Sequence, residues 1–542
     1  MIGKRPAVGV GVIAFAAVVC AACAGADRES ALTMAQVRQV GYLKAAHPDI
    51  GDHFGCGGSL PGHIGNAIAI SADGATIVVG APHESSTARG INGDAADNSL
   101  YAAGAAYVFV RRGDGWVQQA YLKASNAGQS DLFGMNVAVS ADGNTIAVAA
   151  PWERSASTGI NGNQADDSLP QAGAVFVFRR AGESWSQQAY IKASNTGRRG
   201  DAGNLLADGD QFGFSLALSG DGNTMAVGAT TEDSSATGIN GNQADDAAQS
   251  AGAVYVFSRT GNTWSQQGYL KGSNTEAGDL FGYDVSLSGD GSILVAAGYD
   301  EDGPGRGVNV DQGNGVNGSG AIYVFNRTGA NWRQDAYLKG SRSEGNDALG
   351  FSVAISADGS TLVAGAGDEA CLVGGVNPRG CDTDKPEDAS GGSAGAAYVW
   401  VRSSAGWTEQ AFIKASSPQL QDWFAVNLAV SGEGNTLLVG APMEDSGARG
   451  INGDQQSNSA TESGAAYLFI RSGTSWTQQA YVKAENADEF DEFGTSVAVS
   501  GDGRRLIVGA RMEGGGEAGI NGSQNDNSMP EAGAVYLFEA PR

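Results

Sequence analysis

Four short phrases recur along this chain at intervals of about 70 residues, and this repetition limits the fold more than any other feature. The first phrase is Trp-x-Gln-Gln-x-Tyr-Leu-Lys with small changes, and it begins at Trp116, Trp185, Trp264, Trp332, Trp407 and Trp476. The second phrase is Phe-Gly or a relative, at Phe54, Phe133, Phe212, Phe281, Leu349, Phe424 and Phe493. A chain with seven similar units is expected to fold as seven similar modules.

The other two phrases predict the strands of each unit. An Asp-Gly or Glu-Gly pair follows each Phe-Gly position, at Asp73, Asp142, Asp221, Asp290, Asp358, Glu433 and Asp502. Asp-Gly between β-rich runs is typical of a hairpin. The fourth phrase is Gly-Ala-Val-Tyr-Val-Phe, as at residues 252–257, and its unbroken apolar run predicts a strand buried on both faces.

Each unit therefore contains four expected strands, of which the last mixes Trp, Tyr and Leu with Gln and Lys as an outer strand would. Seven such units predict an all-β, seven-bladed β-propeller over residues 36–542. The last unit lacks its Trp-x-Gln-Gln strand, and residues 37–44 near the beginning of the chain align with the missing piece. We expect this first strand to complete the last blade and close the ring.

The repeat resembles a known family. Phe-Gly followed by a strand, a turn and Val-Gly-Ala-Pro (residues 79–82 and 439–442) resembles the FG-GAP repeat of the integrin α-subunit propeller, in a bacterial lipoprotein-type form. The resemblance implies a propeller that binds a ligand on one face. Integrin blades that bind calcium carry an Asp-x-Asp-x-Asp-Gly loop, whereas this chain has only a tight turn such as residues 71–74 there, so that calcium site is not carried over.

The N-terminus indicates export. Residues 1–22 have a positive start at Lys4 and Arg5, then an apolar stretch and small residues, as a secretory signal does. Residues 19–23 resemble a bacterial lipoprotein signal, which implies lipidation at Cys23 and a short tether over residues 23–35; the alternative is plain cleavage near Ala22. Lipidation would hold the exported protein in the cell envelope, as an outer-membrane or cell-surface lipoprotein. Without lipidation we expect it to be secreted.

Three cysteines follow Cys23. Cys371 and Cys381 fall in one loop and suit a local disulfide in an oxidising compartment. Cys56 is expected to be a buried small apolar residue.

Oxygen-bearing residues recur at fixed places between the second and third strands of each unit. Every unit has a Glu eleven residues after its turn acid and an Asn eight residues further on, and more Asn and Asp follow. The candidate metal ligands are Glu84, Asn92, Asp94, Asp97, Glu153, Asn161, Asn163, Asp166, Glu232, Asn240, Asn242, Asp245, Glu444, Asn452, Asp454, Glu513, Asn521 and Asp526.

Two interpretations of these residues stay open. They could coordinate Ca²⁺, which takes six to eight oxygen ligands. Alternatively, Asp, Asn and Gly build the turns of a long loop, with side chains bonded to nearby N–H groups. An Asp also stands two residues before each Phe-Gly position, from Asp52 to Asp491. All these groups should gather on the face that carries the loops between strands two and three.

Charge and composition narrow the function. The chain has 33 Lys and Arg against 59 Asp and Glu, a net charge of −26, which disfavours nucleic acid as a partner. Its four His all precede residue 84, and no nucleophile-elbow phrase is present, so we do not expect an enzyme. We expect a cell-surface module that binds an extracellular protein or glycan. The alternatives are a secreted hydrolase or lyase with a central site and a structural envelope lipoprotein.

Overall fold

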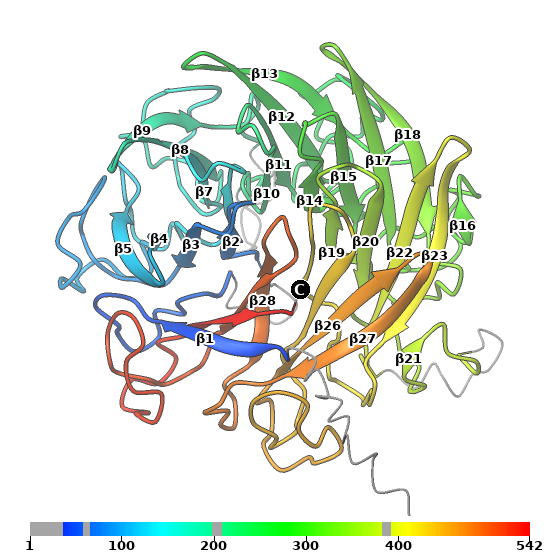
Figure 1. Cartoon of the computed structure of the whole chain (residues 1–542). Helices are drawn as coiled ribbons and strands as arrows, with labels where there is room; N and C mark the ends of the chain where they lie inside the picture. Colours follow the sequence, from blue (N-terminus) through cyan, green and yellow to red (C-terminus); the bar gives the residue numbers. More distant parts are fainter. Residues whose placement is uncertain (1–35, 58–64, 198–208, 382–391, 542) are drawn as a thin grey trace, which may run out of the picture.

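The protein is a ring of seven antiparallel β-sheets (Figure 1). The computed structural model describes residues 36–57, 65–197, 209–381 and 392–541. These residues form strands, turns and loops, and among them no helix has the length and apolar character needed to cross a membrane. The predicted seven-bladed propeller is confirmed. The export signal, the tether and Cys23 lie outside the described residues.

Blades 1 to 4 follow the chain in order, with strands numbered from the centre outward. Blade 1 has β2 (Ile68–Ile70), β3 (Thr76–Ala81), β4 (Ala105–Arg112) and β5 (Gly115–Leu122). Blade 2 has β6 (Val137–Val139), β7 (Thr145–Ala150), β8 (Ala174–Ala181) and β9 (Ser184–Ile191). Blade 3 has β10 (Ser215–Leu218), β11 (Thr224–Ala229), β12 (Ala253–Thr260) and β13 (Thr263–Leu270). Blade 4 has β14 (Phe281–Leu287), β15 (Ile293–Gly298), β17 (Ala321–Thr328) and β18 (Asn331–Lys339), with the short β16 (Gly307–Val308) outside β18.

Blades 5 to 7 continue the same pattern. Blade 5 has β19 (Leu349–Ile355), β20 (Thr361–Ala366), β22 (Ala396–Ser403) and β23 (Gly406–Lys414), with the short β21 (Gly375–Val376) outside β23. Blade 6 has β24 (Leu428–Val430), β25 (Thr436–Ala441), β26 (Ala465–Ser472) and β27 (Ser475–Val482). Blade 7 has β28 (Phe493–Val499), β29 (Arg505–Ala510), β30 (Ala534–Glu539) and β1 (Arg38–Leu43).

The first strand of the chain closes the ring. β1 pairs antiparallel with β30, with Arg38 opposite Glu539 and Leu43 opposite Val535. Figure 1 shows β1 lying beside the end of the chain. The outer strand of blade 7 therefore comes from the opposite end of the sequence, and the predicted closure is confirmed.

The Asp-Gly pairs form the turns between the first and second strands. In blade 2, the Ser140 hydroxyl donates to Asp142 Oδ1 at 2.5 Å, and the Thr145 N–H donates to Ser140 Oγ at 3.0 Å. Gly143 has a φ of 66°, which glycine adopts without strain. Serine and aspartate thus supply the hydrogen bonds of this turn, and glycine supplies its backbone conformation.

These turns also link the blades around the axis. A backbone N–H in each turn donates to a carbonyl in a neighbouring turn, and the seven bonds close into a circle. The donor–acceptor pairs are Ala72–Ala141, Ala141–Gly220, Gly220–Gly289, Gly289–Ala357, Asp358–Gly432, Gly432–Gly501 and Gly501–Ala72. The approach is close, because a Cβ on Gly501 would lie 2.9 Å from the Ala72 carbonyl oxygen. This explains why only Ala and Gly precede the turn acid.

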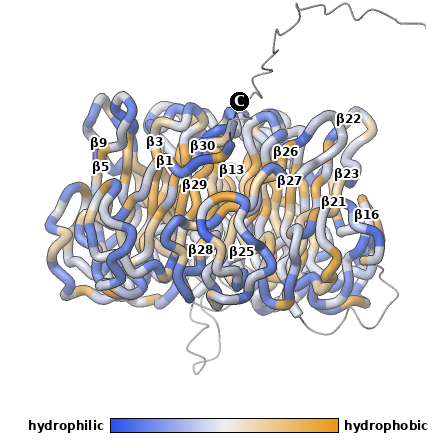
Figure 2. Tube along the Cα trace, turned by 60° about the horizontal axis from the view of Figure 1, so that its bottom comes forward, coloured by the Kyte–Doolittle hydropathy of each residue, from blue (hydrophilic) through white to orange (hydrophobic). Residues whose placement is uncertain are grey.

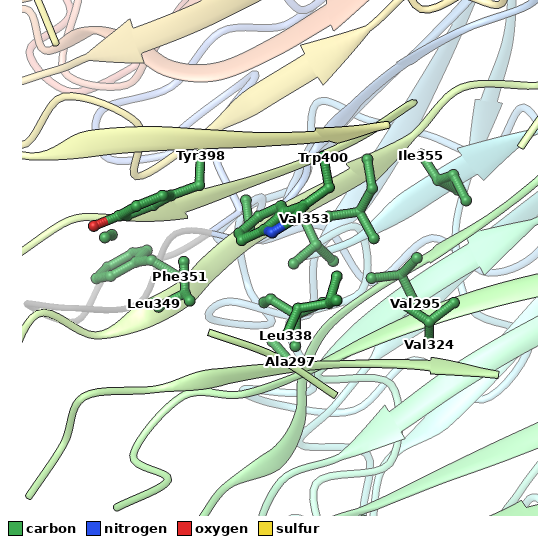
Figure 3. Packing of buried hydrophobic residues seen from close by; sticks show 14 of the residues in the cluster. Val295, Ala297, Val324, Leu338, Leu349, Phe351, Val353, Ile355, Tyr398 and Trp400 are labelled. Carbon is green, nitrogen blue, oxygen red and sulfur yellow. The ribbon is translucent and has the colours of Figure 1, made fainter. Parts of the chain in front are cut away.

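Apolar side chains fill the spaces between neighbouring sheets. Figure 3 shows one such space, where Trp400 and Val353 of blade 5 lie near Leu338 of blade 4. The third strands are buried as predicted, and Trp400 is fully buried. On the outer strands, Trp185 Nε1 donates to Gln119 Oε1 of the preceding blade at 2.9 Å. The recurrent tryptophans therefore pack between blades.

The long loops between second and third strands turn back along the outer strand. In blades 4 and 5 they add β16 and β21, so these two sheets have five strands and not the predicted four. In other blades the loop pairs with the outer strand through one isolated β-bridge, such as the bridge between Ile91 and Leu122. The extra pairing covers the outer edge, which would otherwise present unpaired N–H and C=O groups.

Candidate binding face and central cavity

One face of the ring carries all the long loops between second and third strands, together with the links from each blade to the next. We call it the loop face. Figure 2 shows these largely hydrophilic loops along the lower edge of the ring, away from the marked C-terminus. The opposite face carries the tight hairpins between third and fourth strands, and we call it the hairpin face. The predicted oxygen-bearing residues belong to the loop face.

The seven repeated glutamates are buried in ion pairs. Each carboxylate meets the lysine at the end of the outer strand in its own blade, and every one of these lysine side chains has no exposed surface. The distances are 2.6 to 3.1 Å in six blades. The pairs are Lys44–Glu513, Lys123–Glu84, Lys192–Glu153, Lys271–Glu232, Lys339–Glu301, Lys414–Glu369 and Lys483–Glu444.

Further polar groups surround each pair. In blade 2, the Tyr190 hydroxyl donates to Glu153 Oε1 at 2.9 Å, and Asn126 of the link from blade 1 donates to the same oxygen at 2.8 Å. Burial is the largest influence on Lys192 and lowers its pKa, whereas Glu153 opposes that shift. The base of the loop is therefore a buried, hydrogen-bonded cluster that also joins two blades.

The repeated asparagines bind the backbone of the outer strand. In all seven blades the asparagine Oδ1 accepts an N–H at 2.9 to 3.0 Å from the outer-strand tyrosine, or from phenylalanine in blade 5. The asparagine φ values are 48° to 56°, a conformation that asparagine tolerates better than most residues. The residues are Asn92, Asn161, Asn240, Asn309, Asn377, Asn452 and Asn521.

The other predicted ligands hold the loop tips. Asp166 Oδ2 accepts the Ala156 N–H at 2.7 Å, and Asn163 Oδ1 accepts the Ala165 N–H at 3.1 Å. Loop N–H groups make comparable bonds to Asp94, Asp97, Asn242, Asp245, Asp454 and Asp526. These carboxylates and amides lie near the surface, apart from the buried glutamates. The turn-building interpretation thus accounts for the geometry, and the calcium hypothesis stays a prediction.

Metal ions are often held by three or more His, Cys, Asp or Glu side chains. Among the described residues, one group of this kind has its ligand atoms within 4.8 Å of one another, and it consists of Glu369, Cys371 and Cys381. It contains none of the eighteen predicted ligands. Cys371 and Cys381 form a disulfide with a Cα–Cα distance of 5.5 Å, which closes the blade 5 loop. Cys56 is buried, as expected.

The aspartates before the Phe-Gly positions close turns of their own. Asp131 Oδ2 accepts the Gly128 N–H at 2.7 Å. Burial raises the pKa of Asp131 to about 7, and the backbone hydrogen bond opposes the rise. Six more blades repeat this bond, at Asp52, Asp210, Asp279, Asp347, Asp422 and Asp491.

A cavity of about 230 Å³ runs along the axis between the innermost strands of all seven blades. Alanine occupies the same channel position in six blades, and Ser286 occupies it in blade 4. Two residues earlier, six blades carry a polar residue, which is Asn136, Ser215, Asp284, Ser352, Asn427 or Ser496. Sequence comparison between the units could have found this position, but its residue types vary and hide the pattern.

Asp284 differs from the others by its charge. It is the only ionisable side chain among the described residues that line the cavity, apart from the neighbouring Tyr283 hydroxyl. Asp284 Oδ2 accepts the Val353 N–H of blade 5 at 2.7 Å, and Asp284 Oδ1 accepts the Val285 N–H at 2.9 Å. Burial raises the pKa of Asp284 to about 7, against these hydrogen bonds and one from Ser352.

With the geometry in view, comparison with known proteins identifies the repeat. The FG-GAP repeat model matches residues 116–178, 264–325 and 476–538, each running from an outer strand to the third strand of the next blade. Three segments of the chain thus match the FG-GAP repeat. Four further units of the structure repeat the same strand order, so these FG-GAP segments are parts of one closed propeller. No curated protein matches the sequence.

Two solved structures are weakly similar to this chain, with TM-scores below 0.5. One is a putative 6-phosphogluconolactonase from Bacteroides uniformis, with 10% identity, a TM-score of 0.42 and coverage of 77% of this chain and 85% of that one. Another is the WD40 repeats of RRP9, with 10% identity, a TM-score of 0.43 and coverage of 91% and 99%.

Proposed function

We propose that this FG-GAP propeller is an exported, integrin-like binding module that recognises a protein or glycan through its loop face. The observation that carries the proposal is the contrast within each long loop. Its base is fixed by a buried Lys–Glu pair, and its tip exposes polar residues such as Asp94 and Asn98. A surface of this kind presents repeated groups with little loss of conformational freedom on binding.

The repetition favours a ligand with repeated features. Five loops share the Gly-Ile-Asn-Gly phrase, and their tips occupy one face of one ring. Several weak contacts to the same ligand would add up through high effective concentration. Glycan chains and extended protein surfaces offer such repeated features.

The chemistry of the tips indicates the groups that a ligand should offer. Carboxylate and amide oxygens dominate them, with exposed residues Asn98, Asp167 and Asp246 at one equivalent position in blades 1 to 3. These groups accept hydrogen bonds from hydroxyl and N–H donors. A neutral or basic glycan or protein fits, and the net charge of −26 disfavours nucleic acid.

Attachment to the envelope is part of the same proposal. A lipid on Cys23 would tether the ring through residues 23–35, and plain cleavage would release it. Calcium remains a prediction restricted to the tips, because the glutamates already bind lysines. Titration with CaCl₂ against a chelator, followed by thermal melting, tests it.

Two matched triple variants test the binding face on glycan arrays and immobilised extracellular proteins. Asn98→Ala, Asp167→Ala and Asp246→Ala alter the tips of blades 1 to 3. Asp114→Ala, Glu183→Ala and Asn262→Ala remove the same charges from the hairpin face of those blades. We expect the tip variant to lose at least about ten-fold in affinity for the ligands that the unaltered protein binds, and the hairpin variant to bind normally. Equal binding by both variants would contradict the proposal.

A further inference from the structure

We propose that the central cavity binds a small organic cation of the ammonium type, with the Asp284 carboxylate as its counter-charge. This site is separate from the loop tips. The proposal comes from blade 4, which places a carboxylate at the axis where the six other blades carry Ala, Ser or Asn.

The structural role at this position does not require a charge. In blade 6, Asn427 Oδ1 accepts the Val497 N–H of blade 7 at 3.0 Å. In blade 4, Asp284 Oδ2 accepts the equivalent Val353 N–H of blade 5 at 2.7 Å. A neutral asparagine therefore makes the same link between blades. The aspartate adds a negative charge inside a protein cavity, which is unfavourable without a partner.

In the part of the chain that the structure describes, no cation forms an ion pair with this carboxylate. The groups that face it are the Val285 and Val353 N–H groups and the Ser352 hydroxyl. They are neutral donors. A positively charged ligand would supply the missing charge.

The lining favours an organic cation over a metal ion. Ca²⁺ needs six to eight oxygen ligands, and Asp284 is the one carboxylate among the described residues that line the cavity. Phe214, Tyr283 and Phe351 occupy the same position in blades 3, 4 and 5 and border the cavity. Their rings pack against one another in the core, and Tyr283 also stacks on Tyr299 at 4.3 Å between ring centroids, so they form a fixed wall beside the carboxylate.

The size of the cavity limits the ligand. About 230 Å³ is below the usual range for drug-sized molecules. Choline is a suitable probe, and 3,3-dimethylbutan-1-ol is its neutral match in shape, since carbon replaces the charged nitrogen.

Isothermal titration of the purified full protein with these two probes tests the proposal. We expect choline to bind, and its neutral match to bind at least about ten-fold more weakly. Asp284→Asn should weaken choline binding at least ten-fold, because the charge is lost but the Val353 link is kept. Asp114→Asn, in an exposed hairpin, removes the same charge elsewhere and should leave binding unchanged.

The pH dependence separates a specific site from general attraction. Affinity should fall about ten-fold between pH 8 and pH 6, as Asp284 takes up a proton. Equal binding of the neutral probe, full affinity in Asp284→Asn, equal competition by Na⁺, K⁺ or Ca²⁺, or no binding at about 10 mM choline would each overturn the proposal.

Discussion

Lys483 Nζ lies 2.9 Å from Glu444 Oε2, and both side chains are buried below the loop face. Six other blades repeat this pair. Its repetition at the base of every long loop makes it the main device that joins the loop face to the strands. It also determines how these loops should respond to mutation.

Removing one partner of a buried Lys–Glu pair should lower the stability of the protein much more than replacing both partners. Lys483→Met leaves the Glu444 carboxylate buried without its cation, which should lower the free energy of unfolding by about 3–5 kcal/mol. Adding Glu444→Gln keeps an acceptor for the Tyr481 hydroxyl and removes the charge. The double variant should therefore be more stable than Lys483→Met alone, as measured by chemical denaturation.

A partly exposed pair provides the control for this experiment. Arg449 and Asp488 are 3.1 Å apart with about half of each side chain exposed. Arg449→Met should change stability by less than about 1 kcal/mol. If Lys483→Met had an equally small effect, the anchoring role of the buried pairs would be wrong.

The stabilising effect of each repeated asparagine should separate into a contribution from its backbone conformation and one from its side-chain hydrogen bond. Asn161 combines a φ of 55° with an Oδ1 that accepts the Tyr190 N–H at 3.0 Å. Asn161→Gly keeps the backbone conformation and loses the hydrogen bond, and Asn161→Ala loses both. We expect Asn161→Ala to be the less stable variant by about 1 kcal/mol, with Asp as the mildest replacement. Thermal melting of the three variants measures this order, and a reversed order would contradict it.

Stability should fall as pH rises through neutrality because of the buried aspartates. The pKa of Asp131 rises from 3.8 to about 7 on folding, so the folded state holds a proton that the unfolded state has lost between these values. Its contribution is therefore full below pH 4 and disappears as pH rises through about 7. Asp131→Asn keeps an acceptor for the Gly128 N–H and should melt with a weaker dependence on pH between about 5 and 8. An unchanged pH dependence in Asp131→Asn would contradict this assignment. Asp114→Asn removes an exposed carboxylate and serves as the control, which should keep the pH dependence of the unaltered protein.

The seam between β1 and β30 should be essential to the ring. Deleting residues 34–46 leaves the edge of β30 uncovered and should lower the free energy of unfolding by about 5 kcal/mol or more. Residues 38–46 can be moved behind Glu539 through a two-residue Gly-Asp turn, as residues 113–114 join β4 to β5. This rearranged chain should recover the lost stability in calorimetry. Normal melting of the deletion, or no recovery in the rearrangement, would contradict closure.

Much of the fold could be predicted from the sequence because its signals repeat. An Asp-Gly or Glu-Gly pair predicts each inner turn, and the missing Trp-x-Gln-Gln strand of the last unit indicates residues 37–44. The short strands β16 and β21 could not be predicted, since Gly307–Val308 and Gly375–Val376 carry no strand pattern of their own. They form because the outer strand offers an edge.

The site was less predictable because the important partners are distant in sequence. Lys483 and Glu444 are 39 residues apart, and neither residue type alone shows that the Glu of the loop pairs with the Lys of the outer strand. That lysine is present in all seven units, so pairing the two series was within reach of the sequence. Asp284 was missed because asparagine and serine occupy its position in other blades, and only the cavity shows that its charge is exceptional.

The pairing of Arg38 with Glu539 joins residues 501 positions apart. During synthesis the first strand emerges from the ribosome long before its partner, because the two strands are separated by the six other blades. Blade 7 cannot assemble before β30 has been translated, and a product truncated before β30 cannot close the ring. Closure of the ring thus reports that synthesis has passed β30.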